Sequence, residues 1–306
     1  MKMKPATKLL VDGGDPRETR HIRDLLGYLD GQTTNPSLVA KNPEIHSRLV
    51  SQGKLSRAEA KQEYKRLVQA IAPLVGEAGV SIEVFSDLDT MAEEMVQEGR
   101  DMFSWVRNAY VKYPCTHEGL RAAEMSVREG LRVNLTLCFS QHQAASVYAA
   151  TKGSLAPVYV SPFVGRLDDI GINGIDLVRN IKRMYQAGDG HVHVLAASLR
   201  NVHHLLSSFA SHAELATAPG KVFEEWARAG FPLSDENDGS SLKNHRDGAL
   251  APIVYEEVDL NAPWESFDLK HELTTEGIQK FVADYEGMLR KSGADPALQE
   301  QSMRGR

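Results

Sequence analysis

Three charged side chains stand within or at the end of short apolar segments, where an unpaired charge is costly to bury. Asp12 ends the segment 8–12, Glu83 stands within 80–85 and Lys112 within 109–113. A buried ion pair between Lys112 and Glu83 or Asp12 would serve packing alone. Alternatively, a lysine removed from water loses its proton more readily, and its free amine can attack a carbonyl carbon. These residue types leave both interpretations open.

Small polar side chains accompany the charges on neighbouring segments. Segment 131–139 alternates between apolar and polar residues, which places Asn134 and Thr136 on one face of a strand. Segment 158–161 ends on Ser161. The carboxyl ends of parallel barrel strands meet at one face, where barrel enzymes carry out their chemistry. We therefore predict one central site built from several strand ends.

The elements that would position these residues alternate between strands and helices, which is typical of repeated βα units. Eight strands are predicted, at 8–12, 31–34, 80–85, 109–113, 131–139, 158–161, 191–197 and 215–218. Helices are predicted from residue 16 and at 56–75, 89–107, 117–129, 141–151, 175–186, 201–212 and 271–290. The count favours the α/β class and a single (β/α)8 TIM barrel with extra helices and a C-terminal helix. A doubly wound open sheet would use the same pattern.

The length of 306 residues fits one barrel domain, so we predict a single domain over residues 1–306. Residues 231–269 interrupt the alternation with prolines and an acidic, glycine-containing run, and are expected to form an irregular surface segment. Residues 292–306 are predicted to be a flexible tail.

Composition restricts the class of protein. The net charge of −6 argues against a nucleic-acid surface, which usually carries a basic excess. No apolar run is long enough to span a membrane, and no apolar signal segment follows the first residues. Two cysteines, Cys115 and Cys138, are too few for a disulfide framework. A cytoplasmic globular protein is expected.

Five sequence blocks resemble the transaldolase family. They are QTTNPSL at 32–38, VKYPCTHEGL at 111–120, VNLTLCFS at 133–140, SPFVGRLDD at 161–169 and AASLRN at 196–201. The blocks occur in the family's order between about residues 9 and 220. One such block could arise by chance, whereas five in order with compatible spacing indicate relationship.

The resemblance implies a catalytic set. Lys112 would form an imine with the ketone of a ketose phosphate, and Asp12 would take the proton of the C4 hydroxyl while the C3–C4 bond breaks. Glu83 and Thr136 would hold a water that carries protons during formation and hydrolysis of the imine. The protonated imine is the electron sink, so no metal and no organic cofactor are expected.

The resemblance also implies substrate-binding residues for small-molecule sugar phosphates. Asn35, Asn134 and Ser161 would orient the hydroxyl groups of the dihydroxyacetone unit. Arg166, Ser198 and Arg200 would bind the phosphate, because guanidinium groups match pairs of phosphate oxygens. Phe163 would line the same pocket. A homodimer or another homo-oligomer is expected from the family.

Two positions bear on the type of reaction. In the fructose-6-phosphate aldolase branch of the family, a Gln and a Tyr occupy the positions of Glu83 and Phe163, so this sequence favours transfer over release of dihydroxyacetone. Two residues depart from the family pattern. Tyr113 replaces a small aliphatic residue, and His117 stands where Trp is frequent. These departures could reshape the acceptor pocket and change the sugar substrates.

Two other classes of protein were considered. A zinc enzyme could use His191 and His193, or His203 and His204, but no third ligand at a recognisable spacing follows. A binding protein without enzymatic activity could retain the fold and the phosphate site. Binding alone would not require the complete set of catalytic residues, which favours the enzyme.

Overall fold

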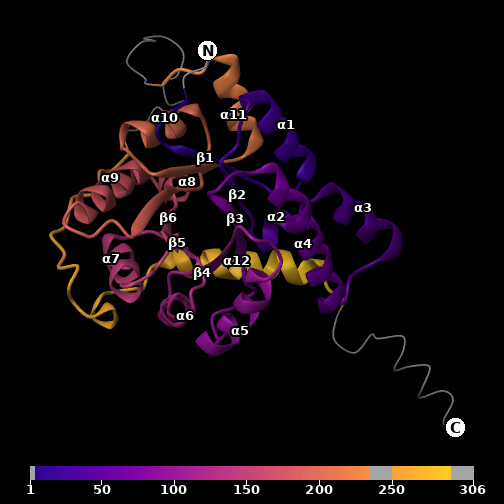
Figure 1. Ribbon diagram of the computed structural model, residues 1–306, viewed down its shortest axis with the longest axis horizontal. Helices are drawn as coiled ribbons and strands as arrows, with labels where there is room; N and C mark the ends of the chain where they lie inside the picture. Colours follow the sequence, from indigo (N-terminus) through magenta and orange to yellow (C-terminus); the bar gives the residue numbers. More distant parts are fainter. Residues whose placement is uncertain (1–3, 234–249, 291–306) are drawn as a thin grey trace, which may run out of the picture.

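The computed structural model describes residues 4–233 and 250–290. Its eight strands are all parallel and form a closed barrel in sequence order, with β1 paired to both β2 and β8 (Figure 1). The strands are β1 (Lys8–Asp12), β2 (Gly31–Thr33), β3 (Gly79–Glu83), β4 (Ala109–Pro114), β5 (Val133–Cys138), β6 (Val158–Pro162), β7 (Val192–Ala196) and β8 (Leu215–Ala218). The predicted (β/α)8 barrel is confirmed, and the open-sheet alternative is excluded because β1 and β8 share a hydrogen-bonded edge.

An outer layer of helices surrounds the barrel. Most of them follow the strands as predicted, and several begin at a capping side chain, as in the reciprocal bonds between Ser56 and Glu59. The helices of this layer are α1 (Pro16–Leu26), α4 (Arg57–Ile71) with the 3-10 turn η1 (Ala72–Leu74), α5 (Ala92–Phe103), α6 (His117–Arg128), α7 (Gln141–Ala150), α9 (Gly174–Tyr185), α10 (Val202–Ala210) and α11 (Gly220–Arg228).

Further helices decorate the barrel, and several were not predicted. α2 (Pro36–Ala40), α3 (Pro43–Gln52) and α8 (Val164–Asp169) are short, and α11 lies where no helix was expected. α12 (Glu272–Met288) corresponds to the predicted C-terminal helix and crosses the carboxyl ends of the strands, shown in yellow in Figure 1. α2 and α8 have only five and six residues, and α3 buries only Ile45, so none of the three shows a clear apolar periodicity in the sequence.

The predicted boundaries around the third strand were too wide. β3 ends at Glu83 rather than at residue 85, and α5 begins at Ala92 rather than at residue 89. Asp87 accounts for the difference, because its carboxylate accepts hydrogen bonds from the backbone N–H of Asp89 and from the hydroxyl of Thr90. An aspartate that bonds to the following backbone stabilises a turn in place of a helix or strand.

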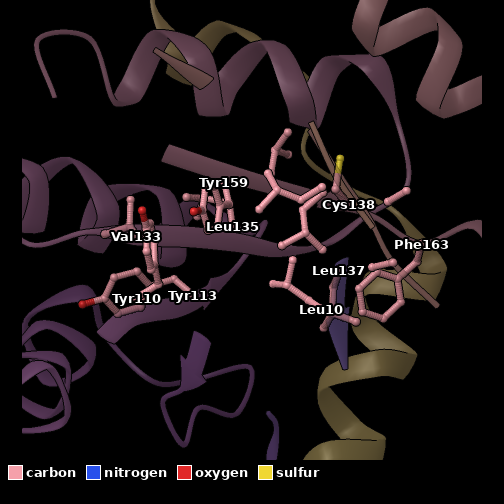
Figure 2. Close-up of a cluster of buried hydrophobic side chains, with 14 of the residues drawn as sticks. Leu10, Tyr110, Tyr113, Val133, Leu135, Leu137, Cys138, Tyr159 and Phe163 are labelled. Atoms are coloured by element: carbon pink, nitrogen blue, oxygen red, sulfur yellow. The ribbon is translucent and has the colours of Figure 1, made fainter. Parts of the chain in front are cut away.

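Outward-facing strand residues and the inner faces of the helices form one continuous apolar core. Figure 2 shows part of this core along β5, from Val133 near Tyr110 and Tyr159 to Leu137 and Phe163 at the other end. Tyr110 and Tyr159 instead lie on the inner face of the barrel, because they are aligned with Ser81 and Asn134, and their rings are stacked with the centroids 4.2 Å apart. The barrel is therefore packed by helices from outside and by these aromatic rings at the amino-terminal end of its interior, which leaves its carboxyl-terminal end to carry polar groups.

The end of β5 departs from regular strand geometry. Leu137 has a φ of 57°, and the register between β5 and β6 shifts between Leu135 and Cys138. The shift directs the carbonyl oxygen of Leu137 to the hydroxyl of Thr274 on α12, at 2.9 Å. A bulge of this kind commonly redirects groups beside an active site, and here it attaches α12 to the barrel mouth.

The region from residue 250 to residue 269 follows the outside of the barrel and contains one 3-10 turn, η3 (Trp264–Ser266). Backbone bonds join Ala251 to Gly171 and Asn173, at 2.8 Å each. Residues 234–249 of the predicted irregular segment and the predicted tail at 292–306 lie outside the described residues. Among the described helices, none combines the length and the apolar character that a membrane crossing requires.

Candidate active site

Strand register brings three polar side chains into one row inside the barrel. Glu83 on β3 is aligned with Lys112 on β4, and Lys112 is aligned with Asn134 on β5. Residues aligned across neighbouring parallel strands point to the same side of the sheet. All three are almost fully removed from solvent. The predicted convergence of strand ends on one centre is therefore present in the structure.

Lys112 has two contacts at this centre. Its Nζ lies 2.9 Å from Glu83 Oε2, and the two side chains are only 4% and 5% exposed. Nζ also donates a hydrogen bond to the carbonyl oxygen of Thr34, at 3.0 Å. A buried ammonium group requires such partners, and both of them accept hydrogen bonds. Lys112 is thus held in one position at the end of β4.

Two carboxyl groups flank the amine. Burial raises the pKa of Glu83, and the neighbouring Lys112 cation partly opposes this rise. Burial likewise raises the pKa of Asp12, again opposed by Lys112 and by the hydrogen bond that Asp12 Oδ1 accepts from Thr33 at 2.7 Å. A carboxyl group with a raised pKa can give and take a proton closer to neutral pH. The site therefore combines an amine with two candidate acid–base groups.

Two buried oxygen atoms beside Lys112 have hydrogen-bonding capacity left. Among the described residues, neither Glu83 Oε2 nor Thr136 Oγ1 has an aligned hydrogen-bond partner, although Glu83 Oε2 is in ion-pair contact with Lys112. Buried polar atoms normally find a partner, and a bound water often supplies it. Each of these two atoms is therefore suited to bind a water molecule.

Asn134 and Ser161 form a short hydrogen-bonded chain. Ser161 Oγ donates to Asn134 Oδ1 at 2.7 Å, and Asn134 Nδ2 donates to Ser81 Oγ at 3.0 Å. Asn35 is fixed differently, because its Oδ1 caps α2 by accepting from the backbone N–H of Leu38 at 2.9 Å. That cap leaves the amide nitrogen of Asn35 as the group that can donate elsewhere.

At the mouth of the site, two arginines come from different elements. Arg166 lies on α8, with its guanidinium 5.3 Å from the ring centroid of Phe163, and Arg200 follows β7. Burial and the nearby Arg200 cation both lower the pKa of Arg166. Arg200 pairs with Asp169 at 3.0 Å, and an anion between the two guanidinium groups would offset the repulsion that remains. The two arginines are therefore suited to bind a phosphate group.

The arginines can approach because of Gly165. A Cβ at this position would lie 2.4 Å from the carbonyl oxygen of Ser198 and 2.5 Å from Cγ of Arg200, closer than real atoms come. The backbone N–H of Gly165 instead donates to that Ser198 oxygen at 3.0 Å. Ser198 itself has a φ of 58°. The close packing of α8 against Ser198 and Arg200 therefore requires glycine at position 165, within the block SPFVGRLDD at 161–169.

One pocket collects most of the predicted site residues. Its volume, including the open mouth, is about 920 Å³. The predicted residues in its wall are Asp12, Asn35, Lys112, Thr136, Ser161, Phe163, Arg166, Ser198 and Arg200. The two others are adjacent, because Glu83 contacts Lys112 and Asn134 bonds to Ser161. All eleven residues thus lie in one region, while their individual roles stay predictions.

Sequence reasoning missed several residues of this pocket. Lys41 at the end of α2, together with Lys280 and Phe281 on α12, lines the mouth. Lys280 is on an exposed position of the helix and forms an ion pair with Asp284 at 3.3 Å. Exposed lysines on helices are common, so the sequence contains no signal that distinguishes these two. Only the path of α12 across the barrel places Lys280 and Phe281 here.

Tyr64 on α4 was also missed. Its fully buried hydroxyl group accepts a hydrogen bond from the backbone N–H of Glu83 at 3.0 Å and contacts Thr34 Oγ1 at 2.6 Å. Thr34 Oγ1 uses its own proton to bond the carbonyl oxygen of Ser81, so Tyr64 is the donor to Thr34. Tyr64 therefore joins the two residues that contact the amine of Lys112.

The histidines of the zinc hypothesis have other contacts. His191 bonds Asp189 and Thr151 Oγ1, and His204 bonds Asp168 at 2.9 Å. Within residues 4–233 and 250–290, no group of three or more His, Cys, Asp or Glu side chains is arranged to hold a metal ion. The two cysteines are free and buried.

Comparison with known proteins agrees with this geometry. Residues 9–292 match the family described as Transaldolase/Fructose-6-phosphate aldolase. A "Probable transaldolase" of Roseiflexus castenholzii is 41% identical over 209 residues, which are 68% of this chain and 83% of the relative. The "Probable transaldolase" of Halalkalibacterium halodurans is 37% identical over 78% of this chain and 98% of its own length. That of Alkaliphilus metalliredigens is 32% identical over 92% of this chain and 100% of its own. The chain therefore belongs to the transaldolase/fructose-6-phosphate aldolase family of enzymes, as its sequence blocks predicted.

Proposed function

We propose that this enzyme transfers a dihydroxyacetone unit from a ketose phosphate, sedoheptulose 7-phosphate or fructose 6-phosphate, to an aldose phosphate through a Schiff base on Lys112. The observation that carries the proposal is the position of Lys112. Its amine lies in a pocket wall, 2.9 Å from a buried carboxyl group, while two arginines line the same pocket. A nucleophile at one end and an anion site at the other match a phosphorylated ketone.

The first step is attack of the free Lys112 amine on the ketone carbon. The carbinolamine must then lose water, and Glu83 can supply the proton because burial raises the pKa of its carboxyl group. A water held between Glu83 and Thr136 would carry this proton over the short distance to the oxygen. The products of the step are a protonated imine and one water molecule.

In the second step the C3–C4 bond breaks. Asp12 removes the proton of the C4 hydroxyl, the electrons of the bond move into the imine, and an aldose phosphate leaves. The raised pKa of Asp12 favours its role as a base that can later return the proton. The remaining enamine on Lys112 attacks a second aldehyde, and hydrolysis then releases the new ketose phosphate.

The donors around the amine suit the three-carbon unit. Asn35, Asn134 and Ser161 would orient its hydroxyl groups, and Arg166, Ser198 and Arg200 would bind the distant phosphate. The family resemblance supports a cytoplasmic role in the pentose phosphate pathway and a homodimer or other homo-oligomer. No cofactor is part of the proposal, because the imine itself accepts the electrons.

The proposal is tested by trapping the imine. The enzyme is incubated with fructose 6-phosphate and sodium borohydride, and its intact mass is measured. Wild type is expected to gain a reduced dihydroxyacetone adduct, and Lys112→Ala is expected to gain none. Lys41→Ala and Lys280→Ala are controls, because these lysines line the same pocket without a buried glutamate partner. An adduct that persists in Lys112→Ala would contradict the assignment of the nucleophile.

A product assay separates transfer from aldol cleavage. With fructose 6-phosphate alone, a transferase retains the dihydroxyacetone unit, and turnover requires erythrose 4-phosphate or another acceptor. Release of free dihydroxyacetone without an acceptor, at a rate similar to the rate with one, would favour the aldolase alternative. Glu83 and Phe163, which stand where the aldolase branch has Gln and Tyr, favour acceptor-dependent turnover.

A further inference from the structure

A buried acid–histidine pair lies directly behind the two arginines and has no part in the proposed chemistry. His204 Nε2 is 2.9 Å from Asp168 Oδ2, and the side chains are 4% and 11% exposed. Asp168 is near the end of α8, the helix that carries Arg166, and His204 is in the first turn of α10. The pair therefore joins two separate elements at the phosphate end of the pocket.

The hydrogen bonds determine which nitrogen of His204 carries the proton. The backbone N–H of Arg200 points to His204 Nδ1 at 3.2 Å, and an N–H group can only donate, so Nδ1 is the acceptor. Nε2 must then carry the proton and donate it to Asp168. The other oxygen of Asp168 accepts from the backbone N–H of Gly174 at 2.9 Å. A neutral imidazole thus links the α8 carboxylate to the backbone of Arg200.

This link has a consequence for the distance between the two cations. Where α8 begins, the backbone N–H groups of Val164 and Gly165 donate to Ala197 and Ser198, at 3.0 Å each. Towards the end of the helix, the bridge through Asp168 and His204 reaches the backbone of Arg200. Arg166 lies between these attachments, so both attachments restrict its position relative to Arg200.

We propose that Asp168 and His204 are positioning residues that set the separation of Arg166 and Arg200 and so determine the affinity of the pocket for a phosphate group. The inference rests on the proposed function, which assigns phosphate binding to these arginines. Bidentate contacts between guanidinium and phosphate require a defined geometry, and a small displacement of a binding group weakens the interaction strongly.

The test uses two substitutions that each retain half of the bridge. In His204→Asn the side-chain oxygen can occupy the position of Nδ1 and still accept from Arg200, but the bond to Asp168 is lost. In His204→Gln the amide nitrogen can occupy the position of Nε2 and still donate to Asp168, but the acceptor for Arg200 is lost. Because the bridge needs both bonds, each variant should bind phosphate more weakly.

The chain offers a matched control. His191 likewise bonds an aspartate, Asp189, through one ring nitrogen and Thr151 through the other. It stands before β7, at the amino end of the strand, and lines no part of the pocket. His191→Gln therefore removes another histidine–aspartate pair, a more exposed one that is distant from the pocket, and so controls for the loss of a histidine bond elsewhere in the barrel.

The measurements are inhibition by inorganic phosphate, the shift of melting temperature caused by phosphate, and kcat/KM with fructose 6-phosphate and with unphosphorylated fructose. For both His204 variants we expect the inhibition constant of phosphate and KM for fructose 6-phosphate to rise about tenfold. The phosphate-induced melting shift should shrink, and kcat/KM with fructose should change less than twofold. His191→Gln should bind phosphate like wild type.

Two results would overturn the inference. One is unchanged phosphate affinity in both His204 variants, and the other is an equal loss of kcat/KM with the phosphorylated and unphosphorylated sugars. If the His204 variants fail to fold, Asp168→Asn supplies the same comparison, because its single oxygen can accept from His204 Nε2 or from the Gly174 N–H but not from both, so the bridge is weakened. The phosphate-induced melting shift does not depend on turnover, so failure of this inference is distinguishable from failure of the Schiff-base proposal.

Discussion

At the scale of single residues, the contact between Lys112 and Glu83 is compatible with two roles. An ion pair that only fills the core would also place these groups about 3 Å apart. The surroundings favour the catalytic role that we propose. A second carboxyl group, Asp12, lines the same pocket as Lys112, and burial raises its pKa. A structural pair would gain nothing from this additional buried acid, whereas acid–base chemistry on an imine requires one.

Tyr64 provides a prediction at this scale. Tyr64→Phe removes the acceptor of the Glu83 N–H and the donor to Thr34, while leaving the ring in the core. Leaving a buried N–H without a partner costs about 1–3 kcal/mol. Because Glu83 and Thr34 both contact Lys112, we expect kcat to fall about tenfold. KM for the phosphorylated ketose should change little, since neither arginine contacts Tyr64.

Tyr113→Phe is the matched control for Tyr64→Phe. Tyr113 is also fully buried, and its hydroxyl contacts Ser126 Oγ on α6 at 2.9 Å. It follows Lys112 on β4 and so points away from the barrel interior. Steady-state kinetics and thermal unfolding of both variants provide the comparison. If the two variants lose the same stability and the same activity, Tyr64 serves only the core.

At the scale of elements, α12 is attached to the barrel by few polar contacts, and Thr274 makes two of them. Its hydroxyl donates to the carbonyl oxygen of Leu137 at 2.9 Å and accepts from Gln143 Nε2 at 2.9 Å. Gly277 also matters, because a Cβ there would lie 2.6 Å from an Arg166 nitrogen and from a Leu137 methyl carbon. The bulge at Leu137 and the first half of α12 therefore fit together closely.

Thr274→Val tests this attachment. The substitution preserves the shape of the side chain but removes both buried hydrogen bonds, so we expect the free energy of unfolding to fall by about 1–3 kcal/mol. Activity should fall as well, because α12 contributes Lys280 and Phe281 to the pocket. Urea unfolding measures the first effect and steady-state kinetics the second. Thr275→Val, at the exposed neighbouring position, should change neither quantity, and equal effects of the two substitutions would contradict the role of Thr274.

At the scale of the whole molecule, charge is distributed unevenly. The chain carries a net charge of −6, yet Lys41, Arg166, Arg200 and Lys280 line the mouth of one pocket. Arg200 and Lys280 pair with Asp169 and Asp284, and Arg166 and Lys41 add further positive charge at the mouth. An excess of one sign in a concave site concentrates the local field and attracts ligands of the opposite sign. An anionic substrate should therefore be drawn to this mouth despite the acidic character of the protein.

The dependence of catalysis on salt follows from this distribution. Raising the ionic strength from about 0.01 M to 0.15 M shortens the screening length from about 30 Å to 8 Å. We expect kcat/KM for fructose 6-phosphate to fall several-fold over this range, and kcat/KM for unphosphorylated fructose to stay nearly constant. The same salt dependence for both sugars would show that the cations at the mouth do not attract the phosphate.

The sequence pattern alone was sufficient for the α/β class, and the family resemblance added the barrel and most of the candidate residues. Strand and helix periodicities are properties of the local sequence, so they can be predicted without the tertiary structure. Asp12, Glu83, Lys112 and Ser161 stand at or near strand ends, and a parallel barrel brings these ends together at one face. The boundary errors around β3 arose because the side chain of Asp87 accepts a backbone N–H hydrogen bond that favours a turn over a helix or strand. The helices α2 and α8 were missed because so few turns produce no clear periodicity, and α3 was missed because it buries only Ile45.

Only the tertiary structure decided which residues touch. The alignment of Glu83, Lys112 and Asn134 depends on strand register, and barrel closure depends on pairing between β1 and β8. The link from Asp168 through His204 to Arg200 likewise joins elements that are separated along the chain. Such contacts arise from the packing of the complete barrel. Local sequence patterns cannot determine them, because each partner has the same pattern whether or not the other is near.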